Sequence, residues 1–169
     1  MRIESIPISI AKVIALSSLV LASCTKEAPV VIEPGKFGEE WPTAIRGNLI
    51  KNKRCIVDSI NGKATRESLK IKRGQPLIIG GWTFSADAGT PSDLYIQLVS
   101  PALTYTALTQ HRVERPDVVQ IYKLDPNWKP GFELQASQNA EPGEYRVEIL
   151  LPTREGVTQC QTQTFVKIE

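Results

Sequence analysis

From residue 48 onward, apolar side chains recur at every second position in short runs that turn residues separate. Phe132, Leu134 and Ala136 alternate with polar neighbours, and Asn61-Gly62 and Pro142-Gly143 are strong turn pairs. Successive side chains of a strand point to opposite faces, so this pattern predicts half-buried β-strands. The segments expected to form strands are 55–60, 69–72, 76–84, 94–99, 103–108, 132–137, 145–151 and 158–168.

The alternation is interrupted at Arg115-Pro116-Asp117. Proline suits the first position of a helix, and an aspartate in the first turn interacts favourably with the helix dipole. Val118, Ile121 and Tyr122 then follow at the spacing of one helical face. We therefore expect one short helix over residues 116–123.

The apolar segment 76–84 contains Gly80-Gly81, followed by Trp82. Glycine inside a strand is typical of a bulge or of a close approach by another backbone. Trp82 lies on an apolar strand and is expected to be buried, because a large aromatic ring contributes most when it is removed from water.

About seven strands with one helix in a crossover predict an antiparallel, immunoglobulin-like β-sandwich over residues 48–169. Five short motifs also stand out: Ile60–Gly62, Gly80–Trp82, Arg115–Val118, Gly131-Phe132 and Pro142–Tyr145. Through these motifs the chain from Cys55 onward resembles sandwich modules of bacterial envelope proteins, a resemblance that implies the fold and no particular activity. Cys55 and Cys160 lie in the first and last expected strands, unlike the antibody pattern, so an antibody-type bridge between sheets is not assumed.

The N-terminal residues have the layout of a secretory signal. Arg2 and Lys12 supply positive charge, residues 13–21 form an apolar run, and small residues follow. A membrane-spanning helix needs about 20 apolar residues, so this run is too short for a permanent span.

The run ends in Leu21-Ala22-Ser23-Cys24, which resembles the lipobox of bacterial lipoproteins. The resemblance implies that residues 1–23 are removed, that Cys24 carries a diacylglycerol, and that its new amino group is acylated, for example with palmitate. Thr25 replaces the aspartate that in many species retains a lipoprotein in the inner membrane, which favours the outer membrane, facing the periplasm. The alternative is an ordinary signal peptide with a chance cysteine.

Once Cys24 is assigned to lipid, Cys55 and Cys160 remain as an even pair. In the oxidising cell envelope such a pair predicts a disulfide. Two buried thiols or a metal site are the alternatives, although a single histidine, His111, makes a poor zinc set.

Residues 24–47 are interpreted as the lipidated N-terminus and a flexible tether. Pro29, Pro34 and Pro42 favour an extended or turning backbone over a helix. Trp41 either packs on the domain or lies at the lipid headgroups.

The net charge of +2 and the interspersed charges argue against nucleic acid as the main partner. The two basic clusters, at residues 51–54 and 70–73, are interpreted as solvated strand faces.

Hydrolase chemistry needs a nucleophile, a base and an orienting group. His111 is the only histidine, and no serine has a nucleophile-elbow motif. We expect no enzyme, metal or cofactor; His111 is interpreted as an exposed loop residue.

The least generic part of the domain is the region around the expected helix. Its candidate binding residues are Arg112, Arg115, Asp117, Tyr122 and Trp128. Arginines beside aromatic rings could hold a sugar or an anionic glycan. Alternatively, Arg115 and Asp117 form a local ion pair while the aromatic residues cover the end of the sandwich. Two functions therefore stay open: a non-catalytic, membrane-anchored lipoprotein that binds another envelope protein, or a binding module for cell-wall or surface polysaccharide.

Overall fold

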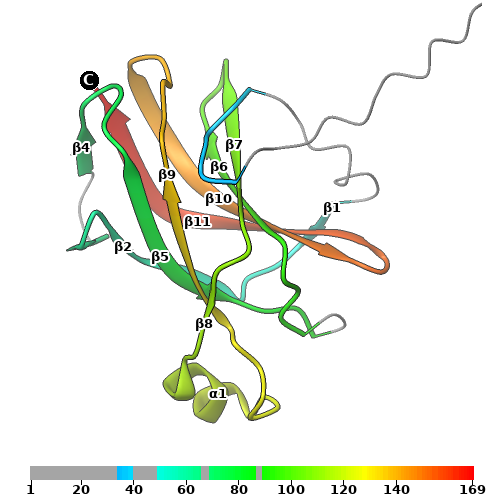
Figure 1. Ribbon diagram of the computed structural model, residues 1–169. Coiled ribbons are helices and arrows are strands. Elements are labelled where there is room, and N and C mark those ends of the chain that lie inside the picture. Colours follow the sequence, from blue (N-terminus) through cyan, green and yellow to red (C-terminus); the bar gives the residue numbers. More distant parts are fainter. Residues whose placement is uncertain (1–33, 40–48, 66–68, 87–88) are drawn as a thin grey trace, which may run out of the picture.

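The computed structural model describes residues 34–39, 49–65, 69–86 and 89–169. The expected signal peptide, Cys24 and most of the expected tether lie outside these residues. The described chain is mainly β, with two sheets that face each other across one core and a single helix at one end (Figure 1). This arrangement is consistent with a β-sandwich.

The larger sheet has six strands. β11 pairs with β10 on one side, and its other edge is shared by β1 and β4, which both run parallel to it. The other neighbours in this sheet are antiparallel. In spatial order the strands are β1 (Leu49–Lys51), β11 (Gly156–Ile168), β10 (Gly143–Thr153), β6 (Leu94–Val99) and β7 (Thr104–Thr109), with β4 (Leu69–Ile71) beside the far end of β11.

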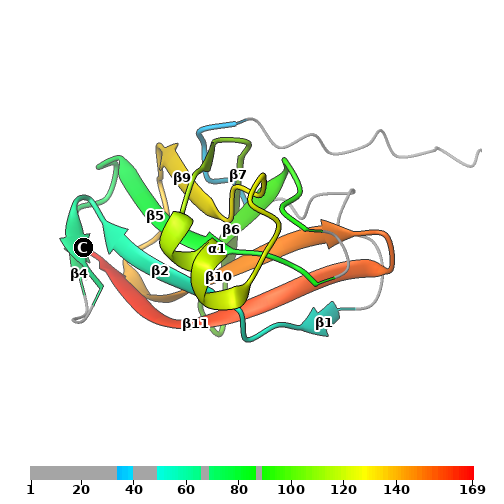
Figure 2. The ribbon, with the colours of Figure 1, turned by 90° about the horizontal axis from the view of Figure 1, so that it is seen from below.

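The smaller sheet has five strands, and all of its pairs are antiparallel. The helix α1 (Pro116–Tyr122) follows its last edge strand and lies at one end of this sheet (Figure 2). In spatial order the strands are β3 (Lys63–Ala64), β2 (Cys55–Ile60), β5 (Leu77–Thr83), β9 (Gly131–Ala136) and β8 (Arg112–Val113).

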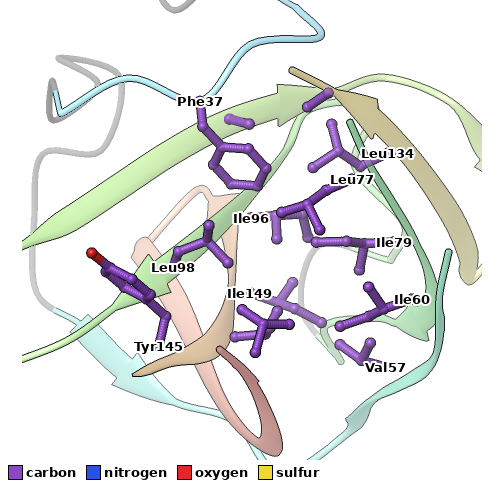
Figure 3. Close-up of a cluster of buried hydrophobic side chains, with 14 of the residues drawn as sticks. Phe37, Val57, Ile60, Leu77, Ile79, Ile96, Leu98, Leu134, Tyr145 and Ile149 are labelled. Carbon is purple, nitrogen blue, oxygen red and sulfur yellow. The ribbon is translucent and has the colours of Figure 1, made fainter. Parts of the chain in front are cut away.

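The core lies between the two sheets and uses the apolar positions of the alternating pattern. Leu77, Ile79 and Leu134 of the smaller sheet meet Ile96 and Ile149 of the larger one (Figure 3). Each of these five residues has an exposed fraction of 2% or less. The apolar residues of the alternating pattern therefore face the core, and the residues between them face the outer sides of the sheets.

The structure has eleven strands within the described residues, compared with the expected seven or so. Eight of them match the predicted segments closely. The other three are β1, β3 and β8, which have two or three residues each. A strand this short shows no periodicity, so only its pairing partner identifies it.

Cys55 and Cys160 form a disulfide with their Cα atoms 6.3 Å apart. Cys55 begins β2 in the smaller sheet and Cys160 lies in β11 of the larger sheet, so the bond joins the two sheets. The predicted pairing of Cys55 with Cys160 is confirmed. The sequence left open whether it would join the two sheets, because the order of strands in the chain does not reveal the sheet that each strand joins.

The expected tether needs a correction for residues 34–39, which pack on the domain. The Gly38 and Thr106 backbones exchange two hydrogen bonds of 3.0 and 2.7 Å, and the Phe37 amide donates to the Ser137 carbonyl at 3.0 Å. Phe37 is 5% exposed and belongs to the main core. This segment therefore contacts both sheets, at β7 and just beyond β9. Its side-chain burial could not be read from a proline-rich sequence.

Candidate functional site

The candidate residues gather around α1 and the connection that follows it, at one end of the smaller sheet (Figure 1). As predicted, Pro116 occupies the first turn of α1 and Asp117 is its acidic first-turn residue. The helix ends at Tyr122, and the left-handed backbone of the next residue, Lys123 (φ 52°, ψ 45°), caps it. The helix is thus short because Pro116 sets its start and the left-handed Lys123 sets its end.

An aromatic cluster holds α1 against the outer side of β5. The ring centroid of Tyr122 lies 5.3 Å from that of Trp82 and 5.2 Å from that of Phe84. Trp128 lies 6.5 Å from Phe84 on the other side, and Val118 is buried in the same cluster. Trp82 is buried as expected, but in this cluster and not in the core between the sheets. Tyr122 and Trp128 therefore cover the end of the sandwich, which was one of the two interpretations.

Arg115 forms the ion pair with Asp117 that the second interpretation predicted. Its Nε and Nη2 donate to the two carboxylate oxygens of Asp117 at 2.9 and 2.7 Å. Its Nη1 donates to Asp58 in β2, so one guanidinium joins the start of α1 to the sheet. The hydrogen bond from Arg115 lowers the pKa of Asp117 to about 2, and the two carboxylates raise the pKa of Arg115.

Arg112 has a different environment, since it donates to three backbone carbonyls. Its Nε reaches the Lys129 oxygen at 3.1 Å, and its Nη2 reaches the oxygens of Thr83 and Pro130 at 3.0 and 3.3 Å. Burial lowers the pKa of Arg112 to about 10. Within the described residues its Nη1 is buried without a hydrogen-bond partner. Arg112 thus fastens the connection before β9 to the end of β5.

Trp128 forms one wall of a shallow groove between α1 and the connection. The ring packs on Gly89, where an added Cβ would lie 3.1 Å from it. The groove has a volume of about 430 Å³, with Gln120 and Asn127 among its polar side chains and Lys129 paired with Glu114 at 3.4 Å. Its apolar lining is Pro116, Val119, Pro126 and Trp128.

The three residues at helical spacing, Val118, Ile121 and Tyr122, are buried to different extents. Val118 is 3% exposed, Tyr122 is 42% exposed, and Ile121 is 72% exposed. The helix has only seven residues, and the rings of Trp82 and Phe84 meet one side of it. Helical spacing indicates a shared face, but the neighbouring strand decides how much of that face is covered.

Sequence reasoning missed three residues in or beside this site: Asp58, Phe84 and Ile56. Asp58 lies 57 positions from Arg115, and no local signal links the two. Phe84 closes the apolar segment 76–84, and its place beside Trp82 at every-second spacing was an available signal for the aromatic cluster. Ile56, also missed, lies opposite Trp82 on β2 and is 47% exposed.

His111 lies in an exposed position, with its Nδ1 4.0 Å from the Glu133 carboxylate. Within the described residues, no group of three or more His, Cys, Asp or Glu side chains is arranged to hold a metal ion. Over the same part of the chain, no helix has the length and apolar character needed to cross a membrane.

Comparisons with protein-family models, with curated proteins and with solved structures found no match for this chain.

Proposed function

We propose that this chain is a non-catalytic lipoprotein of the bacterial envelope whose domain binds another envelope protein through the outer side of α1. The observation that carries the proposal is the pair Ile121 and Tyr122, two large apolar side chains left exposed on a short helix. The aromatic cluster and the Arg115 ion pairs hold this helix in place. A preorganised apolar surface loses little conformational entropy when a partner covers it.

The proposed domain is immunoglobulin-like. Its support is a contact of Tyr145, whose hydroxyl donates to the Glu141 carbonyl four residues upstream at 2.8 Å. A tyrosine near the start of a strand that bonds back in this way is a hallmark of immunoglobulin-like sandwiches, where it is called the tyrosine corner. Tyr145 belongs to the Pro142–Tyr145 motif and lies near the start of β10.

The proposed anchor is lipid on Cys24, with the domain in the periplasm at the outer membrane. The disulfide between the sheets supports an oxidising compartment, because such bonds are rare in the cytosol. Several acyl chains hold a protein far better than one, at about 0.8 kcal/mol for each buried CH₂.

The anchor is tested by replacing Cys24 with Ser and separating membranes from soluble envelope proteins. The wild-type protein is expected in the outer-membrane fraction and the variant is expected to leave the membranes. A variant that stays in the membrane pellet and is still processed after Ser23 contradicts the proposal.

The binding surface is tested with Ile121→Ser and Tyr122→Ala, using Ile78→Ser as a matched control. Ile78 is 40% exposed and lies on β5, outside the aromatic cluster. Crosslinking in intact cells is expected to join the wild type and the control to the same envelope protein, and to lose that product in both α1 variants. Melting temperatures measured on the purified domains separate lost binding from lost folding. Crosslinks that survive both α1 substitutions exclude this surface.

The second candidate is glycan binding in the groove beside Trp128. The observation that favours it is an aromatic wall next to the amides of Gln120 and Asn127, a combination that can stack on a sugar and hydrogen-bond its hydroxyl groups. Soluble cell-wall fragments should then quench tryptophan fluorescence in a saturable way, and the double variant Gln120→Ala/Asn127→Ala should abolish the quenching. No saturable change with the wild type excludes this candidate.

A further inference from the structure

The structure separates the two basic clusters that the sequence treats alike. In the cluster at residues 70–73, two of the three basic side chains have carboxylate partners. The Lys70 ammonium lies 3.4 Å from the Glu169 carboxylate, and the Arg73 guanidinium lies 2.7 Å from that of Glu141. This cluster therefore has local charge partners of its own.

The cluster at residues 51–54 has no such partner. Its basic side chains, Lys51, Lys53 and Arg54, are all exposed, and none of them forms an ion pair with any residue that the structure describes. The neighbouring strand β11 contains no acidic residue that could supply one. Three positive charges thus remain uncompensated at one edge of the larger sheet.

Asn52 fixes the backbone that carries these charges. Its backbone amide donates to the Gln159 carbonyl at 2.7 Å, and its side-chain amide donates to the Phe84 carbonyl at 3.0 Å. Its side-chain oxygen accepts from the Arg54 amide at 2.9 Å. The guanidinium of Arg54 lies over the Phe84 ring, 5.7 Å from its centroid. The segment is therefore held to both sheets, and little backbone freedom is lost when a ligand binds it.

Two exposed apolar side chains directly precede the cations. Leu49 and Ile50 are 48% and 41% exposed, and they belong to β1, which pairs with β11 and forms the outermost strand there (Figure 2). Consecutive side chains of a strand point to opposite faces, so these two flank the edge of the sheet. Apolar side chains beside lysine and arginine are the combination that binds an anionic bilayer, where apolar groups enter the acyl boundary and cations meet the phosphates.

An added strand from another protein fits this edge less well. β1 has only three residues, so it offers a very short ladder of hydrogen bonds. Charged residues on an edge, lysine above all, oppose the addition of a further strand. Lys51 lies in β1 itself, and Lys53 follows two residues later.

We propose that Leu49, Ile50, Lys51, Lys53 and Arg54, together called the β1 corner, dock on a membrane surface that contains anionic phospholipid. The choice of a membrane as the anionic partner rests on the proposed lipid anchor, which keeps the domain close to a bilayer. The β1 corner then provides a second membrane contact, which uses none of the α1 residues assigned to protein binding.

The test measures binding of the unlipidated protein to vesicles. The protein is the processed chain, residues 24–169, with the substitution Cys24→Ser, and it keeps every residue that the structure describes. Co-sedimentation compares vesicles of phosphatidylcholine alone with vesicles that also contain phosphatidylglycerol. We expect saturable binding that is at least about tenfold tighter to the anionic vesicles, and that weakens as salt is added.

The cations are tested with Lys51→Gln/Lys53→Gln. This variant is expected to bind the anionic vesicles about 30-fold more weakly, which is the effect of two cations at an anionic surface. Lys70→Gln/Lys72→Gln is the matched control, because it removes the same charge from the other basic cluster. Its binding is expected to stay close to that of the parent chain.

The apolar side chains are tested with Leu49→Ser/Ile50→Ser, which is expected to weaken binding about tenfold. Ile78→Ser, on the other sheet, is the control and is expected to bind like the parent chain. All substituted side chains are exposed, so the melting temperatures are expected to stay the same. If Leu49→Ser/Ile50→Ser melts lower, the lysine variant and its control decide.

Equal binding to the two kinds of vesicle overturns the proposal, and so do equal losses in the two lysine variants. Binding to soluble heparin in place of vesicles shows a general polyanion site and overturns it as well. The fractionation of Cys24→Ser and the crosslinking through α1 do not depend on the β1 corner. Failure of this proposal is therefore distinguishable from failure of the proposed function.

Discussion

Gly81 lies where β5 comes closest to its neighbours in the smaller sheet. A Cβ added there would lie 2.2 Å from the Ile56 carbonyl oxygen and 2.9 Å from the Phe132 ring. The register of β2 shifts directly opposite, between Val57 and Ser59. The Gly80-Gly81 pair predicted a bulge or a close approach, and this site has both.

We therefore expect Gly81→Ala to lower the free energy of unfolding by about 1–3 kcal/mol, the usual effect of forcing an extra carbon into a packed site. Urea denaturation followed by circular dichroism measures the change. Gly38→Ala is the control, because nothing lies within 4 Å of its added Cβ. Equal effects of the two substitutions would falsify the packing argument.

The Arg115–Asp117 pair makes stability depend on pH. The hydrogen bond from Arg115 lowers the folded-state pKa of Asp117 from 3.8 to about 2. A carboxylate with a lowered pKa stabilises the fold above its unfolded pKa, and this contribution is lost as the pH falls toward the folded pKa.

We expect the melting temperature of the wild type to fall between about pH 4 and pH 2, and to fall less in Asp117→Asn. Asp125→Asn serves as the control, because the Asp125 carboxylate accepts hydrogen bonds from Asn127, two residues along the chain. Parallel pH profiles for the wild type and Asp117→Asn contradict the assignment.

At the scale of elements, α1 is held by Val118 and Tyr122 and by the rings of Trp82 and Phe84 that it covers. Val118 is 3% exposed inside the aromatic cluster, and Ile121, three residues later, is 72% exposed. The two side chains are apolar, lie on the same short helix and differ mainly in what surrounds them. Replacing each of them with alanine therefore compares the stability contributed by a buried and by an exposed apolar side chain.

Val118→Ala is expected to cost about 2 kcal/mol, since each buried CH₂ contributes roughly 0.8 kcal/mol and a cavity adds to the loss. Ile121→Ala is expected to change stability by less than about 0.5 kcal/mol. Hydrogen exchange should show faster opening of α1 only in the Val118 variant. A large loss with Ile121→Ala means that another part of the chain covers that side chain.

At the scale of the whole molecule, two separate links join the two sheets. The Cys55–Cys160 bond connects β2 to β11, and residues 34–39 connect β7 to the chain beyond β9. If Cys24 carries lipid, only residues 25–33 separate the membrane from the packed segment. Their reach is at most about 35 Å, so the domain stays near the membrane surface.

Removing the disulfide, as Cys55→Ser/Cys160→Ser, is expected to destabilise the domain by about 2–5 kcal/mol. The two cysteines are 105 residues apart, so the bond constrains nearly the whole unfolded domain. Urea unfolding with and without reductant measures the loss on the wild type. An unchanged midpoint after complete reduction shows that the bond contributes nothing to stability.

The local sequence was enough to place the long strands, the helix and the apolar faces of the alternating strands. Alternation reports which side chains share a face, and Pro116 and Asp117 mark a helix start, so both signals lie within a few residues. The local ion pair between Arg115 and Asp117 was within reach of the same reasoning, because the two residues are neighbours in the chain.

Only the tertiary structure decided which strands pair and which sheet each strand joins. β1 and β4 lie on one edge of β11, Asp58 meets Arg115, and Phe37 enters the core. Each of these contacts joins residues far apart in the chain. A strand's own pattern specifies its apolar face but not its neighbour; that choice depends on how all the apolar faces can be buried at once.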